Sequence, residues 1–213
     1  MAGRGKNDSA TLLPVFLKVA GRRVVVVGGG PVAAAKIEGL AGAGAEILVV
    51  APELRPEIAG LEERGSEQGD GGVWRGLTIA RRAFRPDDLD GAWLVVAAAT
   101  SQVNRQVAAA AEARRLFVVA VDDPQAASAY GAGVVRRAGV TLAVSTDGTA
   151  PALAGLLREG LDAILPDEDE LGAWMAEARA QRAAWRAGGV AMGERRPLLL
   201  SAINRLYEKK DVI

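Results

Sequence analysis

The spacing of hydrophobic residues changes twice in the first quarter of the chain. Residues 24–27 form an unbroken run of valines, which is typical of a strand that is covered on both faces. Glycines follow, and then Val32, Ile37 and Leu40 recur at helical spacing before a second apolar run over residues 47–50. This strand–turn–helix–strand order predicts an α/β fold with a parallel sheet.

Further predicted strands extend the sheet. They cover residues 77–84, 93–98 and 117–121. A helix is expected between the last two strands, with Ser101 as its N-cap. The glycine- and charge-rich residues 64–76 are expected to form a surface loop, and a sixth strand is expected over residues 140–145 after a turn-rich stretch.

Beyond Pro151 the spacing becomes helical throughout. One predicted helical face carries Leu153, Leu156, Leu157, Leu161, Ile164 and Leu165. Asp167 with Glu170 forms a capping-box-like start for the next helix, which the glycines at 188 and 189 should end. A last helix is predicted over residues 197–207.

The glycine turn after the first strand matches a nucleotide-binding motif. Gly28, Gly30 and Ala33 have the G-x-G-x-x-G/A spacing between a predicted strand and a predicted helix. Gly28 would permit a tight turn, Gly30 would let a pyrophosphate approach the backbone, and Ala33 would keep helix and strand close. The start of the helix adds N–H donors and a positive potential for the phosphates.

The end of the second predicted strand differs from a typical NAD site. That strand continues into Ala51 and Pro52, without the terminal acid that usually binds the adenosine ribose. Glu53 comes slightly later and could take that role, whereas Arg55 would favour a 2′-phosphate. The alternative, that both are solvated loop charges, is equally compatible with the sequence. The motif by itself favours NAD over NADP.

The composition narrows the possible chemistry. The 213 residues include no Cys and no His, which excludes disulfides, Cys- or His-ligated zinc and Ser-His or Cys-His relays. The 26 cationic and 26 anionic residues balance, which argues against a nucleic-acid partner. No apolar run approaches the roughly 20 residues of a membrane span, and the first residues lack the apolar stretch of a secretory signal. We therefore expect a cytoplasmic protein with no membrane partner.

Segments in order along the chain resemble one family. They read LPVFLKVAGRRVVVVGGGPVAAAK, GAEILVVAP, LVVAAATSQVNRQV, VAVDDPQAAS and VTLAVSTDGTAPALAGLLREGL. Over residues 13–165 the chain is similar to precorrin-2 dehydrogenase, the dehydrogenase and ferrochelatase module of siroheme synthase. The resemblance implies a homodimer with a Rossmann-like NAD-binding domain over residues 1–131. It also implies a small dimerisation region over residues 132–165 and an all-helical C-terminal domain over residues 166–213.

The resemblance further implies oxidation of precorrin-2 to sirohydrochlorin with NAD⁺ and, in bifunctional members, insertion of Fe²⁺ to give siroheme. The catalytic aspartate of the family falls on Asp122. Without the resemblance, residues 122–124 would be interpreted as a simple turn, because Asp and Pro are favoured in turns. The family's nucleotide contacts fall on Gly29, Gly30, Pro31, Val32, Pro52 and Glu53.

Other candidate site residues have a structural alternative. Thr100 and Asn104 lie at the start of a predicted helix near the expected nicotinamide end, where helix capping is as compatible as cofactor contact. The Ser or Thr that the family places near its tetrapyrrole falls on Ser145 and Thr146, which capping of the following helix would also explain. The arginines that would pair with substrate carboxylates, or else carry solvated charge, are Arg136, Arg137 and Arg158.

The chain departs from the family pattern near the expected active site. It has Val119, Ala120 and Val121 before Asp122, where the family often has Asn-Val-Val. Residues 129–132 read Ala-Tyr-Gly-Ala, where the family usually has an aromatic residue and a proline. These departures bear on ferrochelatase activity more than on the fold. The acids at residues 167–170 fit a first helical turn better than a metal site, so no metal site is expected. A non-catalytic NAD-sensing regulatory module is the alternative function.

Overall fold

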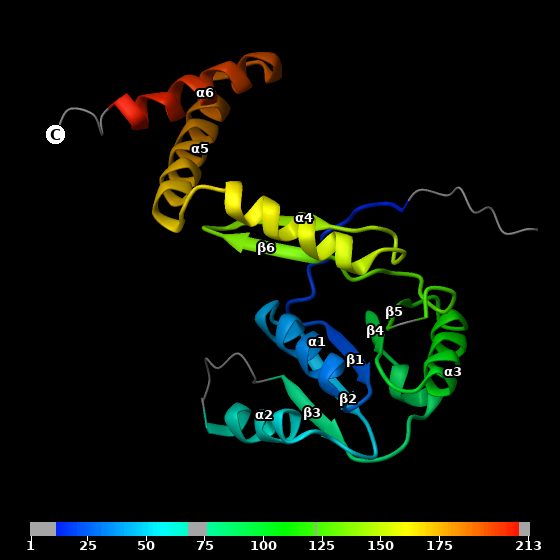
Figure 1. Ribbon diagram of the computed structural model, residues 1–213. Helices are drawn as coiled ribbons and strands as arrows, with labels where there is room; N and C mark the ends of the chain where they lie inside the picture. The colour runs from blue at the N-terminus through cyan, green and yellow to red at the C-terminus, as the bar shows by residue number, and fades with distance from the viewer. Residues whose placement is uncertain (1–11, 68–75, 122, 209–213) are drawn as a thin grey trace, which may run out of the picture. The chain divides into compact units, whose positions relative to one another are not determined.

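The computed structural model describes residues 12–67, 76–121 and 123–208 (Figure 1). The chain divides into two compact units, residues 1–131 and residues 132–213, and each unit is described by itself below. Within the described ranges, none of the helices combines the length and the hydrophobicity that crossing a membrane requires.

The first unit is built on a parallel sheet. Its strands are β1 (Arg23–Val27), β2 (Glu46–Val50), β3 (Leu77–Ala80), β4 (Leu94–Ala97) and β5 (Phe117–Ala120). They lie in the order β3-β2-β1-β4-β5, and every neighbouring pair is parallel. The predicted α/β fold with a parallel sheet is therefore confirmed. Because the direction of the strand order reverses between β1 and β4, the carboxyl ends of these two strands flank the position where open α/β sheets bind ligands.

Helices cover both faces of this sheet. Helix α1 (Pro31–Gly42) and helix α2 (Pro56–Glu67) pack on one face, and helix α3 (Ser101–Glu112) packs on the other (Figure 1). Val24 and Val26 face the first layer, while Val25 and Val27 face the second, and none of the four is more than 2% exposed. Burial on both faces is the reason why the strand reads as an unbroken apolar run.

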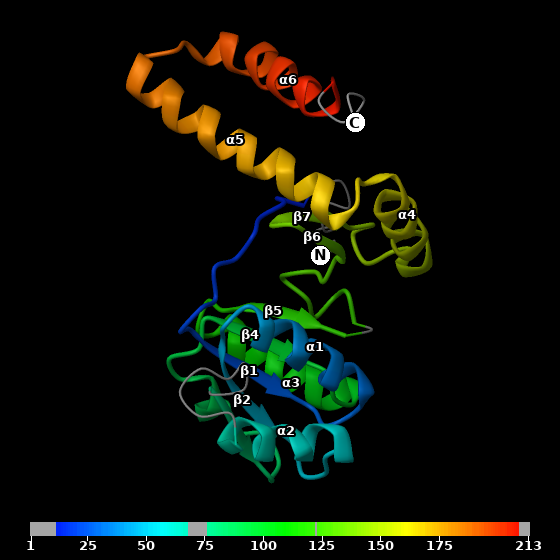
Figure 2. The same ribbon diagram turned by 90° about the vertical axis from the view of Figure 1, so that its left-hand side faces the viewer.

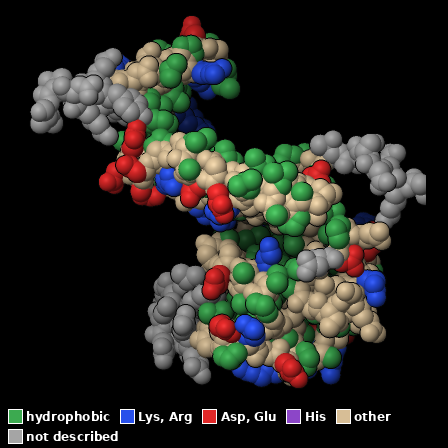
Figure 3. All heavy atoms as spheres, in the orientation of Figure 1, with side chains coloured by type: hydrophobic (Ala, Val, Ile, Leu, Met, Phe, Trp, Pro, Cys, Tyr) green, Lys and Arg blue, Asp and Glu red, His purple; other side chains and the backbone are tan. Residues whose placement is uncertain are grey.

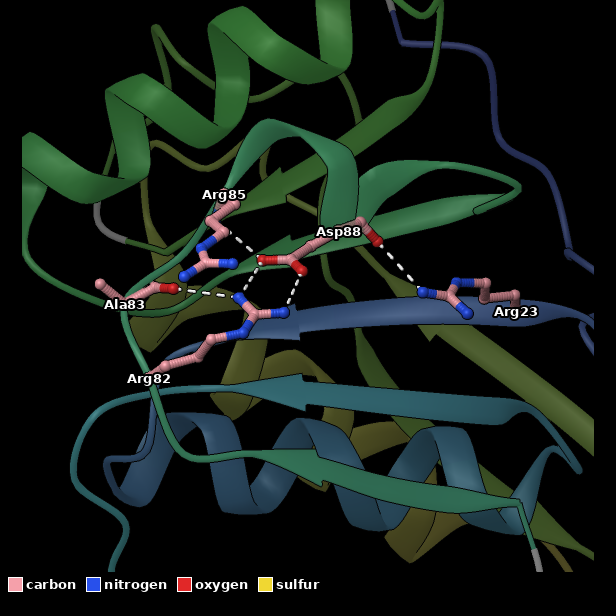
Figure 4. A network of polar contacts seen from close by, with 5 residues as sticks. All are labelled: Arg23, Arg82, Ala83, Arg85 and Asp88. Atoms are coloured by element: carbon pink, nitrogen blue, oxygen red, sulfur yellow. Dashed lines mark hydrogen bonds and ion pairs between the residues drawn. The ribbon is translucent and has the colours of Figure 1, made fainter.

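The connection from β3 to β4 crosses the α3 face of the sheet with only a short 3₁₀ helix, η2 (Pro86–Leu89). The carboxylate of Asp88, which is 7% exposed, accepts hydrogen bonds from Nη1 and Nη2 of Arg82 at 2.9 and 2.6 Å. It also accepts the backbone N–H of Arg85 at 2.8 Å, and Arg23 on β1 donates to the Asp88 carbonyl at 3.3 Å (Figure 4). The hydrogen bonds from Arg82 hold the pKa of Asp88 below its usual value. This network fixes the connection against β1.

The second unit consists of a hairpin and helices. Strands β6 (Gly133–Arg137) and β7 (Val140–Val144) pair antiparallel, and helix α4 (Pro151–Ile164) packs against them. Helix α5 (Glu168–Gly188) and helix α6 (Met192–Glu208) follow and contact each other (Figure 2).

The sequence predicts the boundaries of α5 correctly. The Oδ1 atom of Asp167 accepts the N–H of Glu170 at 2.8 Å, so Asp167 is the N-cap. At the other end Gly189 adopts the left-handed conformation with φ 66° and closes the helix. Capping depends on neighbouring residues only, which is why the sequence reveals it.

Other predicted boundaries are wrong. The pattern misses α2, which extends to Glu67 and replaces the start of the loop predicted over residues 64–76; residues 68–75 of that loop lie outside the described residues. It also misses β6 and starts the last helix at Pro197, although α6 begins at Met192 and contains that proline. The N-cap of α3 is Thr100 rather than Ser101. Helix α2 and strand β6 have few apolar residues in a regular period, so their contacts with neighbouring elements decide their conformation.

Candidate nucleotide and substrate site

The glycine turn joins β1 to α1 at the carboxyl edge of the sheet. Gly28 has a φ of +134°, and a Cβ atom there would collide with the carbonyl oxygen of Ala98, just after β4. A Cβ on Gly29 would collide with the carbonyl oxygen of Glu53, after β2. The backbones that follow two neighbouring strands thus close on the turn from both sides, and only glycine fits at these two positions.

Gly30 has different surroundings. A Cβ at this position would meet no described atom within 4 Å, so the backbone of the turn is open here to an approaching group. Gly30 is the N-cap of α1 and contributes no side-chain cap, and Pro31 occupies the first helical position. The N–H groups of Val32 and Ala33 therefore belong to the uncapped first turn, while the Ala33 side chain is fully buried in the core. This geometry suits a phosphate group at the helix N-terminus.

The segment that follows β2 lies against the glycine turn. The backbone N–H of Arg55 donates to the Gly29 carbonyl at 3.0 Å, which brings Pro52 and Glu53 to the rim of the turn. The guanidinium of Arg55 lies 3.8 Å from the carboxylate of Glu57, and both side chains are more than half exposed. The predicted roles of Glu53 and Arg55 in distinguishing NAD from NADP stay predictions.

Thr100 and Asn104 organise the carboxyl ends of β4 and β5. The Oγ1 atom of Thr100 accepts the N–H of Val103 at 3.5 Å, as the N-cap of α3. Asn104 is 2% exposed. Its Oδ1 atom accepts the Ala99 N–H at 2.9 Å, and its Nδ2 atom donates to the Val121 carbonyl at 3.3 Å. These bonds favour the structural alternative for both residues, and their contact with the cofactor stays a prediction.

Asp122, the predicted catalytic residue, lies outside the described residues, so its role stays a prediction. The residues that follow it form a turn. The Oδ1 atom and the carbonyl of Asp123 both accept the N–H of Ala126, at 3.2 and 3.1 Å. The hydroxyl of Tyr130 donates to the Pro124 carbonyl at 3.2 Å. Asp123 is therefore a turn residue.

Ser145 and Thr146 make local hydrogen bonds in the second unit. The Oγ atom of Ser145 accepts the N–H of Asp147 at 3.2 Å, and the Oγ1 atom of Thr146 accepts the N–H of Ala150 at 3.3 Å. Ala150 is the N-cap of α4, which has no side-chain cap, so Thr146 bonds the residue before the helix and the capping alternative for it is wrong. A contact of either hydroxyl with substrate is untested.

The three predicted substrate arginines have different surroundings. Arg137 donates from Nη1 to the carbonyls of Leu165 and Pro166 at 2.9 and 2.8 Å, and from Nη2 to Asp162 at 2.6 Å. Arg158 pairs with its sequence neighbour Glu159 at 3.2 Å. Arg136 is exposed and forms no ion pair with any described residue. Arg137 thus has a structural role within its unit, and Arg136 has the guanidinium most accessible to a ligand.

Lys36 also reaches the loop that follows β5, although the sequence analysis does not single it out. Its Nζ atom lies 2.8 Å from the position that a Cβ atom on Gly131 would occupy. A lysine two turns into the helix of a glycine motif is the only local signal for it, and such lysines are usually solvated.

A glycine turn at the point where the strand order of a parallel sheet reverses defines a dinucleotide-binding α/β domain. The family model described as "Putative NAD(P)-binding" matches residues 15–132. This match covers more than half of the chain, and the chain therefore belongs to this NAD(P)-binding family.

The relatives are more specific. The chain is 42% identical over 185 residues to siroheme synthase 3 of Aeromonas hydrophila, which is 86% of this chain and 37% of that protein. It is 38% identical over 199 residues to the siroheme synthase of Zymomonas mobilis, which is 93% of this chain and 40% of that protein. The chain thus spans about two fifths of the length of these curated relatives.

Among solved structures, the chain resembles SirC, a precorrin-2 dehydrogenase. The TM-score is 0.64 at 25% sequence identity, and the match covers 89% of this chain and 88% of that chain. These findings confirm the predicted similarity to the precorrin-2 dehydrogenase module of siroheme synthase, and they support NAD as the cofactor.

Proposed function

We propose that the chain is an NAD-dependent precorrin-2 dehydrogenase that oxidises precorrin-2 to sirohydrochlorin. The observation that carries this proposal is the glycine turn, open at Gly30, in a chain that matches a solved precorrin-2 dehydrogenase over 89% of its length. Residues 1–131 act as the NAD-binding domain in this proposal. Residues 132–165 form the dimerisation region and residues 166–213 the helical C-terminal domain.

The reaction removes a hydride and a proton from the tetrapyrrole, and bound NAD⁺ supplies the hydride acceptor. The backbone N–H groups of Gly29, Gly30 and the first turn of α1 hold the pyrophosphate. Gly28 shapes the turn, because its own N–H donates to the Val50 carbonyl at 3.0 Å. Asp122 accepts the proton, because it follows β5, whose carboxyl end lies at the same edge of the sheet as the glycine turn. The sequence has no His, so the proton acceptor must be a carboxylate, Lys, Tyr, water or a cofactor. Asp122 is the candidate that the family resemblance gives.

Substrate binding involves the second unit in this proposal. Precorrin-2 carries acetate and propionate groups, which a guanidinium pairs with readily. Arg136 is the best candidate of the three arginines, because its guanidinium is exposed and forms no ion pair in the described part of the chain. The other substrate-binding candidates have weaker support, since each already makes the contact within its unit described above: Arg137, Arg158, Ser145 and Thr146.

The direct test combines the purified protein with precorrin-2 and NAD⁺. We expect NADH and sirohydrochlorin to form in equal amounts, which absorbance spectroscopy measures separately. NAD⁺ binding without any NADH would contradict the proposal and favour the NAD-sensing regulatory module.

Iron insertion into sirohydrochlorin is a second candidate function, because the curated relatives are siroheme synthases. Fe²⁺ is a substrate in that step, and Asp122 would accept the protons that leave the pyrrole nitrogens. Sirohydrochlorin and Fe²⁺ should give the siroheme spectrum faster with the protein than without it. Equal rates in the two samples would restrict the protein to the dehydrogenase step.

A homodimer is supported by an apolar face on α4. Leu153, Leu156, Leu157 and Ile164 are between 47% and 76% exposed, and Figure 3 shows hydrophobic side chains on the surface of this helix. A second copy would remove this face from water. Sedimentation should therefore give a dimer for the wild type and a monomer for the Leu156→Glu, Leu157→Glu double variant.

A cytoplasmic location stays a prediction from the sequence.

A further inference from the structure

Lys36 is held close to the loop that follows β5. It lies in the second turn of α1, next to the fully buried Ile37, and its own side chain is half-buried. Its Nζ atom is 2.8 Å and its Cε atom 3.9 Å from the position that a Cβ on Gly131 would occupy. The ammonium group therefore lies against the backbone of Gly131, where a side chain would displace it.

Residues 123–131 bring Gly131 toward the carboxyl edge of the sheet. The N–H groups of Ser128 and Ala129 donate to the Val118 carbonyl at 3.0 and 2.9 Å, and Ser128 Oγ accepts the Val118 N–H at 2.9 Å. A parallel bridge joins Val119 to Ala129. Because the bridge is parallel, the chain after Ala129 continues in the direction of β5 and reaches the edge that carries the glycine turn.

The ammonium of Lys36 has no carboxylate partner among the described residues. Within residues 12–67, 76–121 and 123–208, the ion pairs all involve arginines. A half-buried cation without a counter-ion is less well solvated than one on the open surface, so it gains more from an incoming anion. Lys36 thus provides positive charge at the edge of the sheet where ligands bind.

We propose that Lys36 binds a carboxylate of the tetrapyrrole substrate. The inference rests on the proposed function, because precorrin-2 carries acetate and propionate groups. An ammonium donates three hydrogen bonds without a fixed fork geometry, which suits a flexible propionate. Gly131 contributes by leaving the space that the ammonium and a substrate carboxylate share.

The test compares Lys36→Gln with Lys36→Arg and with Lys18→Gln, a matched change at an exposed lysine of the same unit. We expect Lys36→Gln to raise the KM for precorrin-2 about 10-fold, with kcat and the Kd for NAD⁺ within about twofold of the wild type. Lys36→Arg should keep most of the affinity, and Lys18→Gln should have no effect. The KM of Lys36→Gln should also depend less on salt concentration than that of the wild type.

A second variant tests the geometry without removing the charge. Gly131→Ala places a methyl group where the ammonium lies, so it should raise the KM for precorrin-2 while thermal denaturation remains unchanged. If the wild type is active and Lys36→Gln has the same KM for precorrin-2 as the wild type, the inference is overturned. A weaker Kd for NAD⁺ in that variant would overturn it too, because Lys36 would then bind the cofactor.

A binding measurement separates this inference from the proposed function. Sirohydrochlorin carries the same carboxylates and can be titrated against the tryptophan fluorescence of each variant without any turnover. If the wild type is inactive with precorrin-2, the proposed function fails. Weaker sirohydrochlorin binding by Lys36→Gln would still support the inference, and equal binding by the two proteins would refute it.

Discussion

Replacing Asp88 by asparagine should destabilise the first unit, and the same change at Asp87 should not. The Asp88 carboxylate is 7% exposed and accepts hydrogen bonds from both terminal nitrogens of Arg82 and from the Arg85 N–H. The neighbouring Asp87 side chain is 91% exposed and lies 3.8 Å from Arg114. The two residues share η2 and differ mainly in burial, so Asp87→Asn is a matched control.

The magnitude follows from the partners of Asp88. Removing one member of a fully buried ion pair costs about 3–5 kcal/mol. The Arg82 side chain is 37% exposed, however, and water can solvate its guanidinium when the carboxylate is gone, which reduces the loss. Asparagine also keeps one acceptor oxygen. We therefore expect Asp88→Asn to lower the free energy of unfolding by about 2 kcal/mol, which corresponds to a Tm lower by roughly 6–10 °C.

The pH dependence of this difference provides a second check. Hydrogen bonds from Arg82 lower the pKa of Asp88 in the folded protein relative to the unfolded chain. A lowered folded pKa stabilises the protein above the unfolded pKa of about 3.9, and this stabilisation is lost as the pH falls through the folded pKa. The Tm difference between wild type and Asp88→Asn should therefore be complete at neutral pH and shrink below about pH 4.

Thermal denaturation followed by circular dichroism measures both effects, with the three proteins compared at neutral and acidic pH. Equal Tm values for Asp88→Asn and Asp87→Asn at neutral pH would show that the network of Figure 4 does not stabilise the fold. A Tm difference that persists undiminished at acidic pH would show that the carboxylate charge is not its source.

The remaining predictions concern the candidate site. Gly30→Asp should abolish NAD⁺ binding in calorimetry with little change in Tm, because the position is open but the new charge repels the pyrophosphate; normal affinity would contradict the phosphate-binding turn. Gly28→Ala should instead lower the Tm, because its Cβ collides with the Ala98 carbonyl; an unchanged Tm would refute this packing. Asn104→Leu leaves two backbone groups without their partner and should lower the free energy of unfolding by about 2–4 kcal/mol, as measured by urea denaturation. A decrease below about 1 kcal/mol would mean that water replaces both hydrogen bonds. Asp122→Ala should keep NAD⁺ affinity and lose most precorrin-2 turnover, and full turnover would reject its catalytic role.

Local patterns in the sequence predict the strand and the glycine turn of the proposed nucleotide site. The valines at 24–27 predict β1 because a strand buried on both faces needs an apolar side chain at each position. The spacing of Gly28, Gly30 and Ala33 predicts the turn because the conformational freedom and small size of these residues are local properties. Asp167 and Gly189 predict the ends of α5 for the same reason.

The sequence leaves other roles open because they depend on residues far apart in the chain. From the sequence, Thr100 and Asn104 fit capping and cofactor contact equally well, and it is the structure that adds the bonds of Asn104 to Ala99 and Val121. In the sequence, Arg137 is as good a candidate for binding a substrate carboxylate as any other arginine. In the structure its guanidinium donates to the carboxylate of Asp162, 25 residues later.

The sequence by itself determined the parallel α/β fold, the glycine turn and the similarity to precorrin-2 dehydrogenases, because these depend on hydrophobic period, residue size and motif order. Only the tertiary structure decided which charged groups have partners. It buries Asp88 beside Arg82, and it leaves the ammonium of Lys36 beside Gly131 without a carboxylate from the described residues. The physical reason is that burial and charge pairing depend on how distant segments pack against one another. The local pattern of residues does not predict that packing.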